Sequence, residues 1–256
     1  MNHEEYVARV RKMNPIDDDF LRKMAEDMDF CQEVIQTILE DPYLCIVEIK
    51  SQDAIKNLQG RSVVLDAHCV TQNGTHFNVE VQKSDDDNQQ KRVRYNSACV
   101  TANITDPGSK FENVLTVYVI YITKNDFFKK QRTTYHVDRV IRETGDIVYN
   151  GFSEIYVNAY VKDGSLTSEL MTIFTEDDAY DDWKFPSTSR RKRYFKENEK
   201  GVNELSTIMQ EIKEEGRVEV VMEMYHDHEI SLVQACRRLG FTEEEFLEEE
   251  KKHKKI

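Results

Sequence analysis

The chain has 256 residues and a formal net charge of −13, with 39% hydrophobic and 10% aromatic residues. This apolar content is too high for a disordered chain, and no apolar run approaches the roughly 20 residues of a membrane span. The segment MNHEEYVARVRKM lacks the apolar core of a signal peptide, and the five cysteines are scattered, which predicts a reduced, cytoplasmic protein. The acidic balance argues at first against a nucleic-acid partner, because phosphates attract clustered Lys and Arg.

Residues 15–40 have the apolar spacing of helices. The three aspartates at 17–19 suit a first helical turn, where carboxylates face the positive end of the helix dipole. Asp29 is a candidate N-cap for a second helix. A strand is expected next, from Leu44 to Lys50.

Two strands are expected at 62–70 and 76–82, where apolar and polar side chains alternate on either side of a turn. A helix is expected over 92–104, and Asp-Pro-Gly at 106–108 ends it. Residues 113–123 are almost wholly apolar and β-branched, which is typical of a central strand covered by helices on both faces.

Further strands are expected at 133–141 and 153–161, and helices from Ser168 onward. The whole pattern predicts an α/β protein with a mixed sheet.

The apolar rows of the 62–82 hairpin set its register, because a slip by one residue would turn one row outward. Leu65 and Ala67 can face Val81 and Val79 only if paired residue numbers have an even sum. This condition excludes a two-residue turn and fits a three-residue loop, with Gly74 in the left-handed position that such loops favour.

The same register places Asp66 opposite Glu80, with Gln82 one step along the same face. Two facing carboxylates repel each other unless a cation lies between them. Two carboxylates and a strand carbonyl, for which Val81 is well placed, are hard oxygen ligands that suit Mg²⁺ or Mn²⁺. The alternative is a half-solvated hairpin whose polar face simply meets water.

Four segments resemble, in the same order, those of the bacterial PD-(D/E)xK nuclease family transposases, also called recombination-promoting nucleases. They are DDFLRKMAED, VVLDAHCVTQNGTHFNVEVQ, KRVRYNSACV and DDWKFPSTSRRKRYFKENEKGVNEL. The second resembles the active-site hairpin, and the likeness covers nearly the whole chain. It implies a restriction-endonuclease-like α/β fold, a mixed β-sheet core flanked by helices. The nuclease-like core would span residues 1–165 and a C-terminal helical extension residues 166–256.

The resemblance also implies site residues. Asp66 and Glu80 match the metal-binding acids, and Gln82 matches the third signature position, which is Lys in the wider superfamily. Gln82 can orient a water but supplies no charge, so more of the activation would fall to the metal. The implied activity is Mg²⁺- or Mn²⁺-dependent hydrolysis of DNA in recombination. The alternative is a catalytically silent module of the same fold that binds DNA or protein.

An acid from the first helical region often completes such sites, and Asp19, Glu33 and Glu40 all remain candidates. The family usually has an aromatic residue where Arg22 stands, which leaves the role of that helix face open.

Arg92, Arg94 and Tyr95 on the helix after the hairpin are candidate DNA contacts, with a solvated helix face as the alternative. Residues 91–142 hold ten Lys and Arg against four Asp and Glu, so the segment after the hairpin is basic although the chain is acidic. The basic run at 190–193 could contact DNA or pair with the seven acids between Lys162 and Lys184.

Histidines in two places are weaker candidates for site residues. His68 lies on the polar hairpin face and could contact substrate, whereas His226 and His228 have the wrong spacing for one helical face. The segment 230–249 predicts a short helix, a turn at Gly240 and a second helix. Its acidic second helix suits packing or homo-oligomerisation better than DNA recognition.

Overall fold

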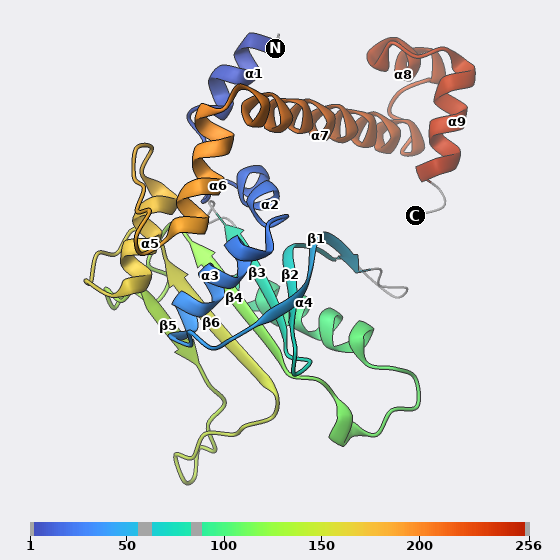
Figure 1. Ribbon diagram of the computed structural model, residues 1–256. Coiled ribbons are helices and arrows are strands. Elements are labelled where there is room, and N and C mark those ends of the chain that lie inside the picture. Colours follow the sequence, from blue (N-terminus) through green and yellow to red (C-terminus); the bar gives the residue numbers. More distant parts are fainter. Residues whose placement is uncertain (1–2, 56–62, 83–88, 254–256) are drawn as a thin grey trace. The chain divides into compact units, whose positions relative to one another are not determined.

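The computed structural model of the protein describes residues 3–55, 63–82 and 89–253 (Figure 1). The described residues form one mixed sheet of six strands in the order β1-β2-β3-β4-β6-β5. The pairs β1–β2, β2–β3 and β5–β6 are antiparallel, whereas β3–β4 and β4–β6 are parallel. The strands are β1 Ile46–Ile55, β2 Val63–Thr71, β3 His76–Gln82, β4 Val117–Thr123, β5 Thr134–Val137 and β6 Phe152–Asn158.

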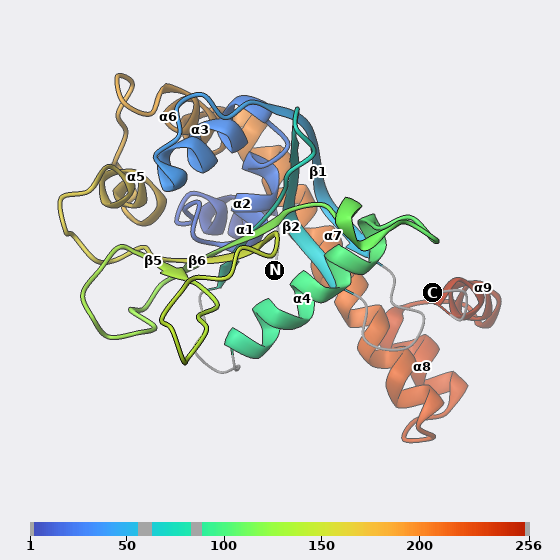
Figure 2. The same cartoon turned by 90° about the horizontal axis from the view of Figure 1, so that it is seen from below.

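Helices cover both faces of this sheet. Figure 2 shows α4 on one face and α2, α3 and α5 on the other, and α5 and α6 pack against α3. The helices are α1 His3–Val10, α2 Asp18–Met24, α3 Met28–Leu39, α4 Gln89–Ile104, α5 Leu166–Thr175, α6 Pro186–Glu197, α7 Glu199–His226, α8 Leu232–Leu239 and α9 Glu243–His253, with a 3-10 turn at Phe111–Asn113. Of the helices in the described residues, none combines the length and apolarity needed to cross a membrane.

The core follows from the composition of β4. Val117, Val119 and Tyr121 face α4 and form an apolar cluster with Val93 and Val100 of that helix. Ile120 and Ile122 alternate to the opposite face and are also fully buried. The expected doubly covered central strand is therefore confirmed, although it begins at Val117 rather than at residue 113.

Two predicted details are wrong. Asp27, not Asp29, caps α3, because its backbone is extended and its carboxylate accepts the Phe30 N–H at 3.0 Å. The strand expected over 133–141 ends at Val137, where its pairing with β6 stops at Glu154.

The chain divides into two compact units, Val7–Leu205 and a second made of Met1–Tyr6 with Ser206–Ile256. The sheet lies in the larger unit, together with α5 and α6. The predicted division between a nuclease-like core, residues 1–165, and a helical extension, residues 166–256, stays a prediction.

The smaller unit has its own apolar cluster, built from α7, α8 and α9 around the fully buried Phe246. Ser231 begins α8 with a capping box, and Gly240 ends it in the left-handed region at φ 76°. Thr242 and Glu245 form a capping box that begins α9: the Thr242 N–H donates to Glu245 at 2.7 Å, and the Glu245 N–H donates to the Thr242 hydroxyl at 3.2 Å. Self-association through these helices stays a prediction.

Phe246→Ala should destabilise the smaller unit by about 3–5 kcal/mol, because it leaves a cavity among the side chains of three helices. Hydrogen exchange measured by mass spectrometry should become faster in α8 and α9, while β4 keeps its protection. Val233→Ala changes a side chain that is 66% exposed on α8 and should leave exchange unaltered. Equal acceleration in β4 would instead show that the two units unfold together.

Candidate functional site

The β2–β3 hairpin has the predicted register next to its loop. The pairs run from Val70 opposite His76 to Ala67 opposite Val79. Gly74 lies in the left-handed region at φ 78°, in a loop of three residues as expected. Within the described part of the hairpin, the ladder ends at Ala67.

The two strands separate at Asp66, so the predicted pairs of Leu65 with Val81 and of Asp66 with Glu80 do not form. β2 stays paired with β1 as far as Val63, beyond the point where its ladder with β3 ends. Leu65 joins the apolar cluster under α4 instead. The Val81 N–H, which a continued ladder would use, donates to Asp66 Oδ2 at 3.2 Å.

Asp66 is only 6% exposed and meets a guanidinium group. Arg22 Nε donates to Asp66 Oδ1 at 3.1 Å, and the two outer nitrogens of Arg22 lie 4.0 Å from Asp18 and from Asp19. Burial raises the pKa of Asp66, Arg22 opposes this shift, and the nearby Glu80 adds to it. Arg22 is therefore a member of the site that the sequence marked only as a departure from the family pattern.

Glu80 is 3% exposed and is held by amides. Asn78 Nδ2 and Asn96 Nδ2 donate to its Oε1 at 2.7 and 2.6 Å. Burial raises the pKa of Glu80, and these two hydrogen bonds oppose the shift. Oε2 accepts no hydrogen bond from the residues that the structure describes, so one carboxylate oxygen is available to a ligand.

The sequence pattern did not point to the two amides, Asn78 and Asn96, as site residues. Asn96 lies four residues after Arg92 on α4, and this spacing brings both side chains to the same helix face. Asn78 Oδ1 has no hydrogen-bond partner in the described part of the chain, although the residue is fully buried. An amide that leaves its own oxygen unpaired in order to hold Glu80 indicates how strongly the fold constrains this carboxylate.

Gln82, at the end of β3, is half-buried and accepts a hydrogen bond from Arg92 Nη1 at 3.1 Å. Arg92 thus lies beside the site, as one of the three candidate DNA contacts. Arg94 is exposed on α4, and Tyr95 is half-buried against the apolar cluster. The structure brings only Arg92 of these three to the acids.

The structure places the three candidates for an additional acid in different surroundings, and only one of them lies near Asp66. Glu33 accepts the backbone N–H groups of Ser187 at 3.0 Å and Thr188 at 2.7 Å, so it caps the start of α6. Glu40 ends α3 in a left-handed conformation and lines, with Glu33, a cavity of about 670 Å³. Asp19 alone lies near Asp66, through Arg22.

Asp18, which was not singled out, is the second acid at this place. Burial and the nearby Asp66 raise the pKa of Asp18 to about 6. The signal was its position one helical turn before Arg22, on the same face of α2.

The donor set fits a divalent cation. Asp18, Asp19, Asp66 and Glu80 carry four negative charges against two positive charges on arginines, so the surplus matches one divalent ion. The backbone N–H and C=O groups of even-numbered residues of β3 point to β4. Those of Val81 therefore point to the gap beside β2, where its carbonyl could contact a metal ion. Groups of three His, Cys, Asp or Glu arranged for a metal were not found in the described residues, so backbone and water oxygens would complete the shell.

Histidines on the hairpin pair with each other. His68 Nε2 lies 2.8 Å from His76 Nδ1, and burial, aided by His68, lowers the pKa of His76. His68 therefore contacts a histidine of the neighbouring strand β3.

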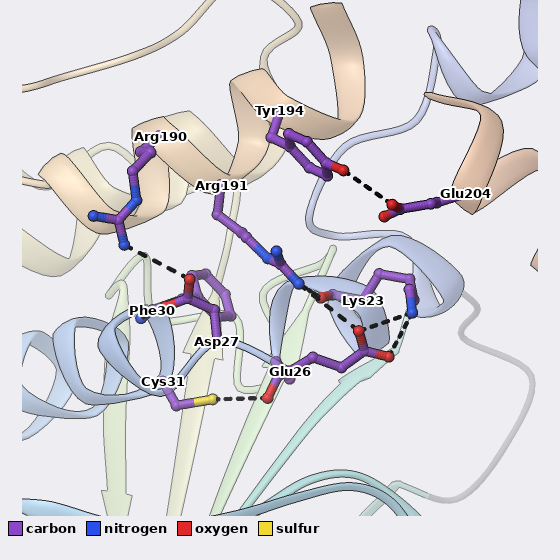
Figure 3. A network of polar contacts seen from close by, with 10 residues as sticks. Lys23, Glu26, Asp27, Phe30, Cys31, Arg190, Arg191, Tyr194 and Glu204 are labelled. Atoms are coloured by element: carbon purple, nitrogen blue, oxygen red, sulfur yellow. Dashed lines mark hydrogen bonds and ion pairs between the residues drawn. The ribbon is translucent and has the colours of Figure 1, made fainter. Parts of the chain in front are cut away.

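Three arginines of the basic run on α6 pair with acids, but only one of them with the segment between Lys162 and Lys184 that was predicted. Figure 3 shows Arg190 and Arg191 directed at the loop between α2 and α3. Arg190 lies 3.6 Å from Asp27, and Arg191 lies 3.8 Å from Glu26. Arg193 pairs with Asp182 at 3.1 Å, the one contact of this set with the acidic segment that the sequence suggested.

Lys192 is fully buried and donates to backbone carbonyls at the end of α5, among them Ile173 at 3.0 Å. In the smaller unit, His226 pairs with Glu250 at 3.0 Å. The run at 190–193 and His226 thus have structural partners.

A mixed α/β sheet with an antiparallel hairpin joined to parallel strands, and with buried acids where the hairpin opens, defines a nuclease-like protein of the PD-(D/E)XK class. A family model described as PD-(D/E)XK nuclease family transposase matches residues 23–235, and the chain belongs to that family. Searches of curated proteins and of solved structures found no significant match.

Glu33→Ala should lower the free energy of unfolding by about 1–2 kcal/mol, because two N–H groups at the start of α6 lose their acceptor. Glu33→Gln keeps an acceptor oxygen and should lose about half as much. Urea unfolding of both variants measures this. Both variants should bind Mn²⁺ with the affinity of wild type. A loss of affinity would show that Glu33 is the additional acid of the site after all.

Asp18→Asn should stabilise the metal-free protein at pH 7, because the folded state raises the pKa of Asp18 and so opposes its ionisation. The gain should be about 1 kcal/mol, since half of the side chain is exposed to solvent screening. It should shrink as the pH falls through 6 and vanish below about 4, where Asp18 is neutral in both states. Thermal unfolding in EDTA measures it, with Asp106→Asn as an exposed control. A gain that grows toward pH 4 would contradict the assignment.

Proposed function

We propose that the protein is a metal-dependent endonuclease that hydrolyses phosphodiester bonds of DNA. In this proposal Asp66 and Glu80 hold Mg²⁺ or Mn²⁺, and Gln82 orients the attacking water. The observation that carries it is the pair of buried acids at the opening of the hairpin, in a chain of a nuclease family. A carboxylate is buried at such cost only where a cation or strong donors compensate it.

Each side chain has a definable task. Asn78 and Asn96 fix Glu80 by one oxygen and leave the other for a ligand. Arg92 fixes the amide of Gln82, which can hydrogen-bond a water but cannot take its proton. A divalent ion, when bound, would neutralise charge on the scissile phosphate and lower the pKa of a water.

DNA would approach over α4. Arg92 and Arg94 are both exposed on that helix, and the basic excess of residues 91–142 surrounds them in sequence. Because the whole chain is acidic, we expect weak, salt-sensitive binding that depends on the divalent ion.

The second candidate function is a silent module of the same fold that binds DNA or protein. One observation favours it: Arg22 already compensates Asp66 without a metal. A module would need no further cation at this place.

Asp66→Asn and Glu80→Gln should each lower Mg²⁺-dependent plasmid nicking by at least about 100-fold, because each removes a charged oxygen ligand while keeping the side-chain shape. Glu48→Gln is a matched control, since it neutralises a half-exposed acid on the neighbouring strand β1. Calorimetry with Mn²⁺ should show binding to wild type and to the control only.

Three results would change the proposal. Wild-type cleavage by Glu80→Gln would refute the residue assignment. Binding of Mn²⁺ without cleavage by wild type would favour the silent module. If wild type neither binds Mn²⁺ nor cleaves DNA, the proposed metal site is refuted.

A further inference from the structure

Arg22 holds one oxygen of Asp66, the acid proposed as a metal ligand. Its Nε donates to Asp66 Oδ1 at 3.1 Å, while the Val81 N–H takes Oδ2 at 3.2 Å. Both oxygens of this carboxylate are therefore used by protein donors. Each oxygen keeps a second lone pair, but a metal ion bound to Asp66 would lie close to the Arg22 guanidinium, and the two positive charges would repel each other.

The two donors differ in how easily they can leave. Val81 belongs to β3, which is paired along its length with β4, so its N–H is fixed by the sheet. Arg22 holds Asp66 with a side chain that is 23% exposed on α2 and can change rotamer. The donor that yields is therefore Arg22.

A displaced Arg22 has a place to go. Asp18 and Asp19 lie four and three residues before it on α2, and their carboxylates are already 4.0 Å from its outer nitrogens. A small rotation toward these acids would exchange one ion pair for another. The guanidinium would keep a partner, and the site would keep its charge balance with the divalent ion added.

We propose that Arg22 is a positioning residue that closes the site in the metal-free protein and competes with the divalent ion for Asp66. This inference rests on the proposed metal site at Asp66 and Glu80. Two cations cannot share one carboxylate oxygen at short range without repulsion, so each weakens the binding of the other. The guanidinium stabilises Asp66 when no metal is bound, and it raises the metal concentration needed to load the site.

Arg22→Gln tests this with two measurements that need no cleavage. In EDTA the variant should unfold at a lower temperature than wild type, because a buried carboxylate loses its partner. By calorimetry it should bind Mn²⁺ about tenfold more tightly, and saturating Mn²⁺ should raise its unfolding temperature by more than it raises that of wild type.

Arg193→Gln is the matched control, because it removes the same charge from a surface pair with Asp182 in the same unit. It should bind Mn²⁺ as wild type does. If Arg22→Gln does not fold, Arg22→Met decides, since it removes the charge and the donor but keeps an unbranched side chain. An affinity above that of wild type supports the inference, and an equal or lower one overturns it.

Failure of the inference can be told from failure of the proposed function. Equal Mn²⁺ affinity of wild type and Arg22→Gln, with binding abolished in Asp66→Asn, would overturn the competition but keep the metal site. Weaker binding by Arg22→Gln would also overturn it and would make Arg22 a support for Asp66. Absence of Mn²⁺ binding from wild type and Arg22→Gln alike would overturn both.

Discussion

The burial of two carboxylates at the opening of a hairpin is the constraint on which the arrangement of the larger unit depends. Asp66 and Glu80 are 6% and 3% exposed, and a charge removed from water must be compensated by cations or hydrogen bonds. The helices that flank the sheet supply this compensation from opposite faces. From one side α2 brings Arg22 to Asp66, and from the other α4 brings Asn96 to Glu80.

The two acids are compensated in different ways, and the difference matters for function. Glu80 is held by neutral amides on one oxygen, which fix its orientation without adding charge. Asp66 is held by a cation and a backbone N–H, which use both of its oxygens. If the proposed ion binds here, Glu80 would offer it a fixed oxygen, whereas at Asp66 the ion would compete with the charge of Arg22. In that proposal one ligand is fixed and the other is conditional.

How much of this follows from the sequence depends on the range of the interaction involved. The hairpin register and the turn at Gly74 follow from alternation within neighbouring residues, and both were predicted. The central strand followed from composition in the same way. The separation of the strands at Asp66 was not predicted, because the alternation of side chains alone would continue the ladder beyond Ala67.

The additional acids show the same limit. Glu33 looked equivalent to Asp19 in sequence, and only the packing of α6 against α3 shows that Glu33 caps a helix. Arg22 was visible as an unusual residue in its segment, but its distance from Asp66 in sequence is 44 residues. Local patterns identify which side chains are polar, whereas tertiary contacts decide which of them compensate each other.

The acidity of the chain is best understood at this site. The acids and arginines there leave a surplus of negative charge, and a DNA phosphate brought next to it would add more. Metal and DNA would therefore bind with positive coupling, since the divalent ion relieves the repulsion that each phosphate meets. Coupling between two ligands is reciprocal, so DNA must raise the affinity for the metal by the same factor. If the proposed ion binds at Asp66, beside Arg22, it should therefore load mainly when substrate is present, and hydrolysis would be restricted to the ternary complex.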